Sequence, residues 1–252
     1  MIFYFSGTGN SSHVAKSIAS ITDDKLISIS KDLIEAKERY QMDEGENLGF
    51  VFPVYWYSLP SIVEKFLKQL NIEGYQNQYV YAIATYGFAG GNVMKQLTGI
   101  LKEHKIPLKG KFGVKMVDNY VVGYSLANRK KQEIIKKEAN VMIEEIGRII
   151  TKKTQAEMIH KGKLAFVSPL TGYAYKNAKH THKFYTTKDC NSCGLCEKNC
   201  PCNVIHLVDG KPSWEGDCTF CLRCLHSCNK TAIQYGKATL KRERYTYSLP
   251  IK

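Results

Sequence analysis

The sequence predicts an α/β domain built on a doubly wound, parallel, five-stranded sheet, followed by a small α+β domain that carries the cysteines. Two observations lead to this division. Apolar strand-like runs and amphipathic helical segments alternate five times in the first part of the chain, as they do in open parallel sheets. The nine cysteines all lie between Cys190 and Cys228, and the first 189 residues contain none. We expect a first domain over residues 1–151, a linker over 152–185, a second domain over 186–236 and a basic tail over 237–252.

The strands and helices of the first domain can be placed in chain order. Two continuous apolar runs, LGFVFPV over residues 48–54 and YVYAIAT over 79–85, are typical of parallel strands buried on both faces. Shorter strand-like runs lie at residues 1–6, 25–30 and 111–117, and helices are expected at residues 13–21, 60–70, 91–104 and 128–151. The linker loses this alternation, so we expect its His180 and His182 to form an exposed polar pair.

Composition and charge narrow the function. With 44% hydrophobic and 23% charged residues, the chain has the composition of a globular protein. No apolar run approaches the roughly 18 residues of a membrane span, and the first residues do not resemble a signal peptide, so we expect a cytoplasmic protein that does not bind membranes. The formal net charge of +13 would suit nucleic acid, but the basic runs Arg129–Lys131 and Lys136–Lys137 lie on a helix with an apolar face. We therefore expect no nucleic-acid binding, because an acidic protein partner or anionic cofactors account for the charge equally well.

Eight of the nine cysteines form an internal repeat. The spacing C-x2-C-x2-C-x3-C occurs at Cys190, Cys193, Cys196 and Cys200 and again, 28 residues later, at Cys218, Cys221, Cys224 and Cys228. Three closely spaced thiolates can wrap a short loop around three corners of one cubane, and the fourth thiolate must come from elsewhere in the chain. A zinc site normally uses cysteine pairs in C-x2-C format, which fits this spacing less well. Asp209-Gly210, between the two copies, predicts a hairpin turn.

This segment resembles the bacterial two-[4Fe–4S] ferredoxins over about 50 residues. In those proteins the fourth cysteine of each copy binds the other cluster. The resemblance therefore implies two [4Fe–4S] clusters, one held by Cys190, Cys193, Cys196 and Cys228 and the other by Cys218, Cys221, Cys224 and Cys200. Pro201 follows Cys200 as in the ferredoxin pattern, whereas Asn229 stands where the second proline would be. Cys202 lies outside the repeat, and we expect it to be a buried packing residue.

A loop rich in glycine and hydroxyl side chains joins the first strand to the first helix. The loop Ser6-Gly7-Thr8-Gly9-Asn10-Ser11 directs backbone N–H groups and hydroxyls to one place at the start of a helix, which suits a phosphate. It lacks the last glycine of the dinucleotide fingerprint and the Gly-Lys-Ser/Thr of a P-loop. It resembles the FMN-phosphate loop of the flavodoxin family, and the resemblance covers roughly residues 1–150. This implies a flavodoxin-like fold that binds FMN.

Two further loops support the resemblance. One follows the third strand and the other follows the fourth, where flavodoxins carry the loops that contact the flavin, and both lie at the carboxyl ends of strands. The resemblance implies flavin contacts from Pro53, Val54, Tyr55, Trp56, Thr85, Tyr86, Gly87 and Phe88. Aromatic faces can stack on the flat flavin ring, although each of these aromatic residues could instead pack in the core. The segment Asp118–Tyr120, which ends the fifth strand, could face the ligand, face the second domain or form a plain turn.

The complete chain resembles the flavodoxin–ferredoxin fusion proteins of anaerobes. This implies an iron–sulfur flavoprotein that passes electrons between FMN and two [4Fe–4S] clusters, and so connects a two-electron flavin with one-electron carriers. The alternative is a reductase in which the flavin passes electrons or a hydride to an organic substrate, with Tyr86, Tyr120 or Tyr124 as a possible proton donor. As partner we expect an acidic redox protein, such as a ferredoxin, a flavodoxin or an oxidoreductase, attracted by the basic residues in Arg129–Lys137 or Lys237–Arg244.

Overall fold

The computed structural model describes residues 1–37, 39–163, 165–178 and 180–247. Within them, the largest sheet has six parallel strands in the order β2-β1-β4-β6-β7-β8. Their bounds are β1 (Ile2–Tyr4), β2 (Leu26–Ser28), β4 (Leu48–Pro53), β6 (Val80–Tyr86), β7 (Gly110–Lys115) and β8 (Ala156–Met158). If only the strands of this sheet are numbered in chain order, β2-β1-β4-β6-β7 becomes 2-1-3-4-5. This is the flavodoxin-like doubly wound order. The predicted fold class of the first domain is therefore confirmed.

The prediction of five strands is wrong by one, because β8 belongs to the segment expected to be a linker. It pairs with β7 through Gly110↔Ala156 and Phe112↔Met158. A strand of three residues gives no detectable alternation in the sequence, and its pairing depends on the free edge of β7. The same segment forms the 3₁₀ turn η1 (Ala165–Val167) and helix α6 (Ser168–Asn177).

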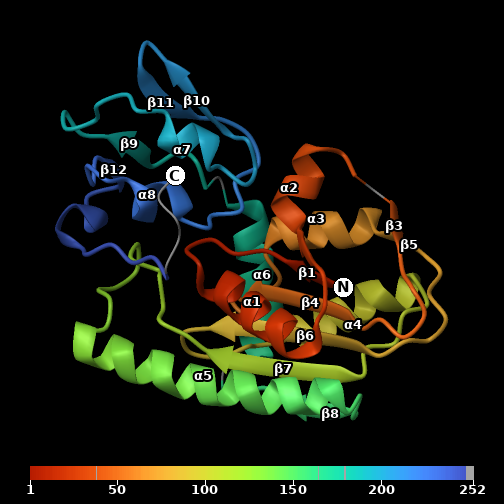
Figure 1. Ribbon diagram of the computed structural model, residues 1–252. Helices are drawn as coiled ribbons and strands as arrows, with labels where there is room; N and C mark the ends of the chain where they lie inside the picture. Colours follow the sequence, from red (N-terminus) through yellow and green to blue (C-terminus); the bar gives the residue numbers. More distant parts are fainter. Residues whose placement is uncertain (38, 164, 179, 248–252) are drawn as a thin grey trace.

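Helices cover both faces of the sheet (Figure 1). Those of the first half are α1 (Asn10–Thr22), α2 (Ile29–Ile34), α3 (Ser61–Gln69), α4 (Val93–Glu103) and α5 (Arg129–Thr151). α1 and α5 pack on one face, and α2, α3 and α4 on the other, beside a small parallel pair, β3 (Arg39–Gln41) and β5 (Asn71–Glu73). Phe50 and Val51 of β4 enter opposite cores, so this strand is buried on both sides as its apolar run predicts. Among the described helices, none combines the length and the apolar character needed to cross a membrane.

The cysteine-rich half consists of short elements. They are β9 (Phe184–Thr186), α7 (Leu195–Lys198), β10 (Ile205–Val208), β11 (Lys211–Trp214), α8 (Arg223–Ser227), β12 (Ile233–Tyr235) and the 3₁₀ turn η2 (Ala238–Lys241). β10 and β11 form an antiparallel hairpin around Asp209 and Gly210, whose φ angles of 50° and 73° suit a tight hairpin turn, so the predicted turn is confirmed. β9 pairs antiparallel with β12, which joins the two ends of this half.

The cysteine-rich half lies against the loops at the carboxyl ends of the large sheet (Figure 1). The Arg223 guanidinium donates hydrogen bonds to the carbonyls of Ser6 at 2.5 Å and Gly7 at 2.9 Å, in the loop after β1. His226 Nε2 donates to the carbonyl of Asn119 at 2.8 Å, in the loop after β7. The edge at which open α/β sheets bind ligands is therefore shared between the two halves.

Candidate functional site

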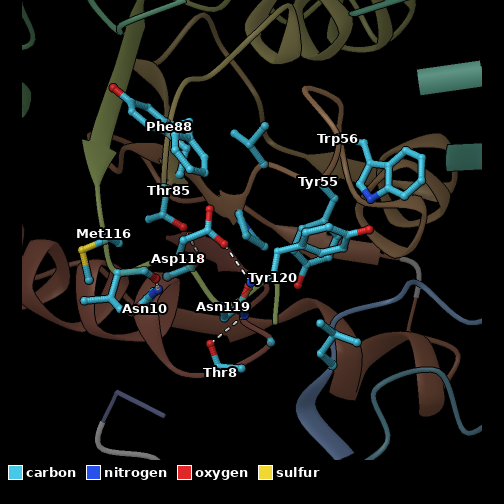
Figure 2. A pocket seen from close by; sticks show the side chains of 18 of the residues that line it. Thr8, Asn10, Tyr55, Trp56, Thr85, Phe88, Met116, Asp118, Asn119 and Tyr120 are labelled. Atoms are coloured by element: carbon cyan, nitrogen blue, oxygen red, sulfur yellow. Dashed lines mark hydrogen bonds between the residues drawn. The ribbon is translucent and has the colours of Figure 1, made fainter. Parts of the chain in front are cut away.

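A cavity of about 450 Å³ opens at the carboxyl ends of β1, β4, β6 and β7 (Figure 2). This large cavity has the size of a small-molecule or cofactor site, for which roughly 300–1,000 Å³ is typical. The predicted residues that line it are Ser6, Gly7, Thr8, Asn10, Ser11, Pro53, Val54, Tyr55, Trp56, Thr85, Tyr86, Gly87 and Phe88. The structure therefore brings three loops that are distant in sequence to one cavity.

Hydroxyl groups gather at one end of the large cavity, beside the N-terminus of α1. Thr8 Oγ1 accepts a hydrogen bond from Asn119 Nδ2 at 2.9 Å, and Ser11 Oγ lies 2.8 Å from Thr85 Oγ1. Figure 2 shows Thr8, Asn119 and Thr85 around this end. The described first turn of α1 carries no acidic side chain, and no side chain caps it. Its unpaired N–H groups and the helix dipole favour an anion at this end.

Gly9 is a predicted site residue that does not line the large cavity. Its φ of 105° lies in the left-handed region that favours glycine, and its N–H donates to Ser6 Oγ at 3.1 Å. A Cβ at this position would collide with the backbone of Tyr247, which crosses the loop and donates from its N–H to the carbonyl of Thr8 at 2.8 Å. Gly9 therefore shapes the loop and admits the tail.

Aromatic side chains form another part of the wall. The rings of Trp56 and Tyr120 meet edge to face, with centroids 6.3 Å apart, and both are visible in Figure 2. Trp56 and Tyr57 have φ angles of 49° and 62°, a costly conformation for residues other than glycine. Thr171 of α6 holds this turn, because its Oγ1 donates to the carbonyl of Trp56 at 2.9 Å. A helix from the expected linker thus fixes the position of Trp56.

Asp118 organises the mouth of the large cavity. Its carboxylate accepts hydrogen bonds from Tyr120 N and from the Tyr124 hydroxyl, each at 2.7 Å. Burial and the Asp118 carboxylate raise the pKa of Tyr124 well above its ordinary value, so this phenol keeps its proton. Phe88 is 64% exposed and packs edge to face against Tyr124 at 5.5 Å. A Cβ at Gly87 would collide with the Asp118 side chain, so a glycine is what lets the carboxylate lie against the loop after β6.

The segment Asp118–Tyr120 faces both the large cavity and the second half, two of the alternatives that the sequence leaves open. All three of its residues line the cavity. The carbonyl of Asn119 accepts from His226 Nε2, and Tyr245 N donates to His226 Nδ1 at 3.1 Å, so this imidazole is neutral with its proton on Nε2. Burial lowers the pKa of His226 to about 4, which keeps it in that form.

Part of the cavity wall comes from residues that sequence reasoning missed. Thr171 and Tyr175 belong to α6, and Phe220 and Leu222 flank Cys221 in the second cysteine motif. Tyr57, Ala89, Met116 and Val117 complete the additional lining. The cysteine spacing says nothing about which way its intervening residues face, so only the packing of the two halves reveals Phe220 and Leu222.

Two smaller cavities lie among the cysteines. The distal cysteine cavity is lined by Cys190, Cys193, Cys196 and Cys228 together with Cys224. The proximal cysteine cavity is lined by Cys200, Cys218, Cys221 and Cys224 together with Cys202. Each cavity contains one of the two predicted sets of four, and the second also contains the cysteine expected only to pack. Within the part of the chain that the structure describes, no group of three or more His, Cys, Asp or Glu side chains is placed to hold a metal ion. Cluster ligation therefore stays a prediction.

The proximal cysteine cavity lies between the other two. Leu222 lines both the large cavity and the proximal cysteine cavity, and Cys224 lines both cysteine cavities. Cys221 is buried, whereas Cys193 of the distal set is exposed. Burial raises the pKa of the Cys196 thiol to about 11 and that of Cys202 to about 12, so these sulfurs are protonated unless a metal centre binds them.

The predicted basic tail is bound to the molecule over its described residues. The Tyr245 hydroxyl donates to Asn10 Oδ1 at 2.8 Å, and the Arg242 guanidinium donates to the carbonyl of Val121. Residues 248–252 lie outside the described part of the chain. The tail thus fastens the first loop and the start of α1 to the second half.

The predicted basic face on α5 is reduced by internal contacts. Lys136 forms an ion pair with Glu133 at 2.9 Å and lies over the Tyr247 ring, 5.5 Å from its centroid. Within Arg129–Lys137 of this helix, the basic residues that remain exposed are Arg129, Lys130, Lys131 and Lys137. They follow the loop that carries Tyr124, at the mouth of the large cavity.

His180 is buried, so the prediction of an exposed polar residue is wrong for it. Its ring stacks on Phe220 with centroids 4.6 Å apart, and its Nε2 donates to the carbonyl of Tyr175 at 2.8 Å. Burial lowers the pKa of His180, and the bond to Tyr175 opposes this effect. A histidine in a polar segment gives no signal of such a contact, which depends on how the second half docks.

Solved structures offer distant likenesses, and neither a protein-family model nor a curated protein matches the sequence. A flavoprotein from Bacteroides uniformis is 19% identical, with a TM-score of 0.36, over 54% of this chain and 94% of its own. The Trp repressor binding protein of Bacillus subtilis is 18% identical, with a TM-score of 0.39, over 60% and 97%. Rubredoxin oxygen:oxidoreductase from the anaerobe Desulfovibrio gigas is 18% identical, with a TM-score of 0.34, over 59% of this chain and 36% of its own. Likenesses this weak carry no conclusion about function, and the flavodoxin-like fold rests on the strand order of the chain itself.

Proposed function

We propose that the chain is an iron–sulfur flavoprotein that passes electrons between FMN in the large cavity and two [4Fe–4S] clusters in the cysteine cavities. The observation that carries this proposal is the order of the cavities. Leu222 is common to the large and the proximal cavity, and Cys224 is common to the proximal and the distal cavity. Centres in cavities that share a wall residue are separated by little protein, so electrons could pass between them without a diffusing carrier.

The residues of the large cavity fit FMN. The uncapped first turn of α1, with Thr8 and Ser11 beside it, offers N–H and hydroxyl donors for the phosphate. Trp56 and Tyr120 offer aromatic surface for the flavin ring. When bound, FMN supplies two-electron chemistry and each cluster supplies one-electron chemistry. The chain contributes the positions of the centres and the polarity around them.

The cysteine cavities fit clusters by their donor sets. The lining of each includes one set of four thiols with the spacing of the two-cluster ferredoxins, in which the fourth thiol comes from the other copy of the repeat. Cys202 lies in the proximal cavity as a fifth thiol. We keep Cys200 as the ligand, because it belongs to the repeat and Cys202 does not.

The partner that suits this chain is an acidic redox protein. Arg129, Lys130, Lys131 and Lys137 are exposed on α5, next to the loop that lines the large cavity. An acidic surface would be attracted to this face and held close to the cavity mouth.

Cofactor analysis of anaerobically purified protein tests the proposal. We expect about one FMN and about eight irons with matching sulfide per chain. Flavin extraction identifies FMN, and the EPR spectrum of the dithionite-reduced protein identifies the clusters. FAD or no flavin in the extract would contradict the assignment of the first half, and zinc in place of iron would contradict that of the second.

One observation favours a second function, the reduction of an organic substrate. The three tyrosines that could donate a proton, Tyr86, Tyr120 and Tyr124, all line the large cavity, and Asp118 holds the Tyr124 hydroxyl. Mixing the reduced protein with quinones or azo dyes separates the two functions. If such a compound reoxidises the flavin rapidly in the wild type and more slowly in Tyr124→Phe, the protein is a reductase. If all such compounds reoxidise the flavin slowly, electron transfer is the function that remains.

A further inference from the structure

Two buried hydrogen-bond donors beside the proximal cysteine cavity make no hydrogen bond of ordinary geometry. The Tyr55 hydroxyl and Trp214 Nε1 are both buried without a partner among the described residues. Buried phenol and indole groups normally have an acceptor, because an unpaired buried donor loses its bonds to water without replacement. Both groups therefore indicate a stronger acceptor than the side chains and backbone around them supply.

Trp214 reaches the proximal cysteine cavity from the end of β11. It lines this cavity, and its ring stacks on Phe184 with centroids 5.3 Å apart. Burial raises the pKa of the Cys224 thiol, and a hydrogen bond from the Trp214 side chain opposes that rise, so the indole N–H is directed at the Cys224 sulfur. An indole N–H can only donate, and a thiol sulfur is a weak acceptor.

Tyr55 approaches the same cysteine set from the first half. Its ring lines the large cavity, as Figure 2 shows. A Cβ built on Gly7 would lie 2.8 Å from the Tyr55 hydroxyl oxygen and 3.1 Å from Cys221 Cβ. The hydroxyl and Cys221 therefore converge on the space that a glycine leaves free. Arg223 fixes this junction by donating to the Gly7 carbonyl at 2.9 Å.

The distal cysteine cavity differs in this respect. Among the residues that the structure describes, no buried side-chain donor without a partner lies in its lining. Its set also includes the exposed Cys193, whereas Cys221 of the proximal set is buried. A further buried donor without a partner, Arg244 Nε, interacts electrostatically with Cys228 of the distal set. Tyr55 and Trp214 are therefore the unpaired phenol and indole that lie beside the proximal set.

We propose that Tyr55 and Trp214 donate hydrogen bonds to sulfur atoms of a [4Fe–4S] cluster in the proximal cysteine cavity and raise its reduction potential. This inference rests on the proposed function. Hydrogen bonds to cluster sulfur stabilise the additional negative charge of the reduced form. Reduction adds one electron to the cluster and moves no proton, so both donors keep their hydrogens.

Redox titration of the full-length holoprotein tests this inference. The variants are Tyr55→Phe and Trp214→Phe, and the matched control is Tyr81→Phe, which removes another buried phenol without a partner from the core under α5. Both cluster potentials are measured by EPR during titration with dithionite. We expect each of the first two variants to make one cluster about tenfold harder to reduce, which is about 59 mV for a one-electron couple. The other cluster, and both clusters of Tyr81→Phe, should keep their potentials.

Unchanged potentials in both variants, or equal shifts of both clusters, would overturn the inference. A wild-type protein without clusters would instead refute the proposed function, and the iron content of each preparation separates the two failures. A second measurement uses the same proteins. Pulse EPR of the reduced wild type in D₂O should detect exchangeable deuterons coupled to the cluster whose potential shifts in the variants, and a coupling that is unchanged in both Tyr55→Phe and Trp214→Phe would also overturn the inference.

Discussion

The two halves of the chain are stabilised by different means. The first half buries two continuous apolar cores against its sheet, and its longest helix, α5, has 23 residues. In the described second half the longest helix, α8, has five residues. The apolar cluster of the second half also borrows Val121 and Tyr175 from outside it. The first half can therefore be specified by its own apolar pattern, whereas the second depends on its neighbours.

Backbone conformation sharpens this difference. Among the described residues, the short cysteine-rich half has six residues other than glycine with positive φ, against seven in the much longer remainder of the chain; the six are Ser192, Asn203, Asp209, Phe220, Leu222 and Thr231. Each costs of the order of 1–2 kcal/mol in isolation. A small shared core offers little to offset such costs, so bound clusters would contribute directly to the folding free energy of this half. We therefore expect the first half to fold by burial alone and the second half to depend also on the proposed clusters.

Removing one cysteine ligand should have the largest effect and should divide the two halves. We expect Cys200→Ala to lose about half of the iron, from the proximal set, because each cluster holds four irons. The cysteine-rich half should become sensitive to limited proteolysis, whereas the first half should keep its FMN. Iron analysis and mass spectrometry of the proteolytic fragments measure both effects.

Cys202→Ala is the matched control for this experiment, because Cys202 lines the same cavity outside the repeat. It should retain both clusters. If Cys202→Ala lost iron and Cys200→Ala kept it, Cys202 would be the ligand and Cys200 the packing residue. Proteolysis of both halves of Cys200→Ala at equal rates would contradict the proposed difference in how the two halves are stabilised.

Substitution of Gly7 should disturb the junction between the halves. In Gly7→Ala the added Cβ would lie 2.9 Å from the carbonyl oxygen of Cys221 and 2.8 Å from the Tyr55 hydroxyl, closer than ordinary packing allows. Overpacking of this kind costs about 1–3 kcal/mol of the free energy of unfolding. Urea titrations followed by tryptophan fluorescence measure the loss.

Gly99→Ala is the opposite control. Gly99 lies within α4 with nothing near the position of an added Cβ, so alanine should stabilise the protein by about 0.5–1 kcal/mol. Equal and small effects of the two substitutions would mean that the halves are not packed at Gly7 as closely as the structure has them.

The same contrast explains how much the sequence predicted. The continuous run of β4 and the long amphipathic α5 carry enough periodicity to place them within one or two residues. The glycine and hydroxyl pattern of the first loop predicted residues that the structure brings to the polar end of the large cavity, and phosphate binding there stays a prediction. The strand β8 depends on the free edge of β7, and the positions of Phe220 and His180 depend on how the two halves pack. A strand of three residues or a single side chain has no periodicity from which such a contact could be predicted.

Charge reversal on α5 should change the rate of electron transfer from a partner protein more than it changes the stability of the fold. We expect Lys130→Glu, Lys131→Glu and Lys137→Glu together to slow flavin reduction by an acidic reduced ferredoxin about tenfold at low salt, because electrostatic steering raises association rates by 10–10³. The effect should disappear near 1 M salt, where the Debye length is about 3 Å. Stopped-flow absorbance measures the rate.

The control is a second triple variant, which changes the net charge by the same amount on the opposite face of the sheet. It combines Lys95→Glu, Lys102→Glu and Lys105→Glu. These lysines lie on or next to α4, which packs on the face away from α5. A rate that falls equally in both triple variants would indicate a response to net charge, and a rate independent of salt in the wild type would exclude the α5 face as the docking site.

The smallest effect should come from His180, which joins α6 to the cysteine-rich half. Burial lowers the pKa of His180 below its ordinary 6.5, so the folded protein favours the neutral ring. Above pH 6.5 the unfolded chain is neutral at this site too, and the residue adds no pH dependence. As the pH falls below 6.5, the unfolded chain takes up a proton that the folded protein refuses, so stability declines until the pH reaches the folded pKa. Thermal unfolding of the holoprotein at pH 7.5 and pH 5.5 should show this loss. His180→Gln should reduce it, because the amide can still donate to the Tyr175 carbonyl but does not titrate. An identical decline in both proteins would show that His180 does not contribute to the acid sensitivity of the contact between the halves.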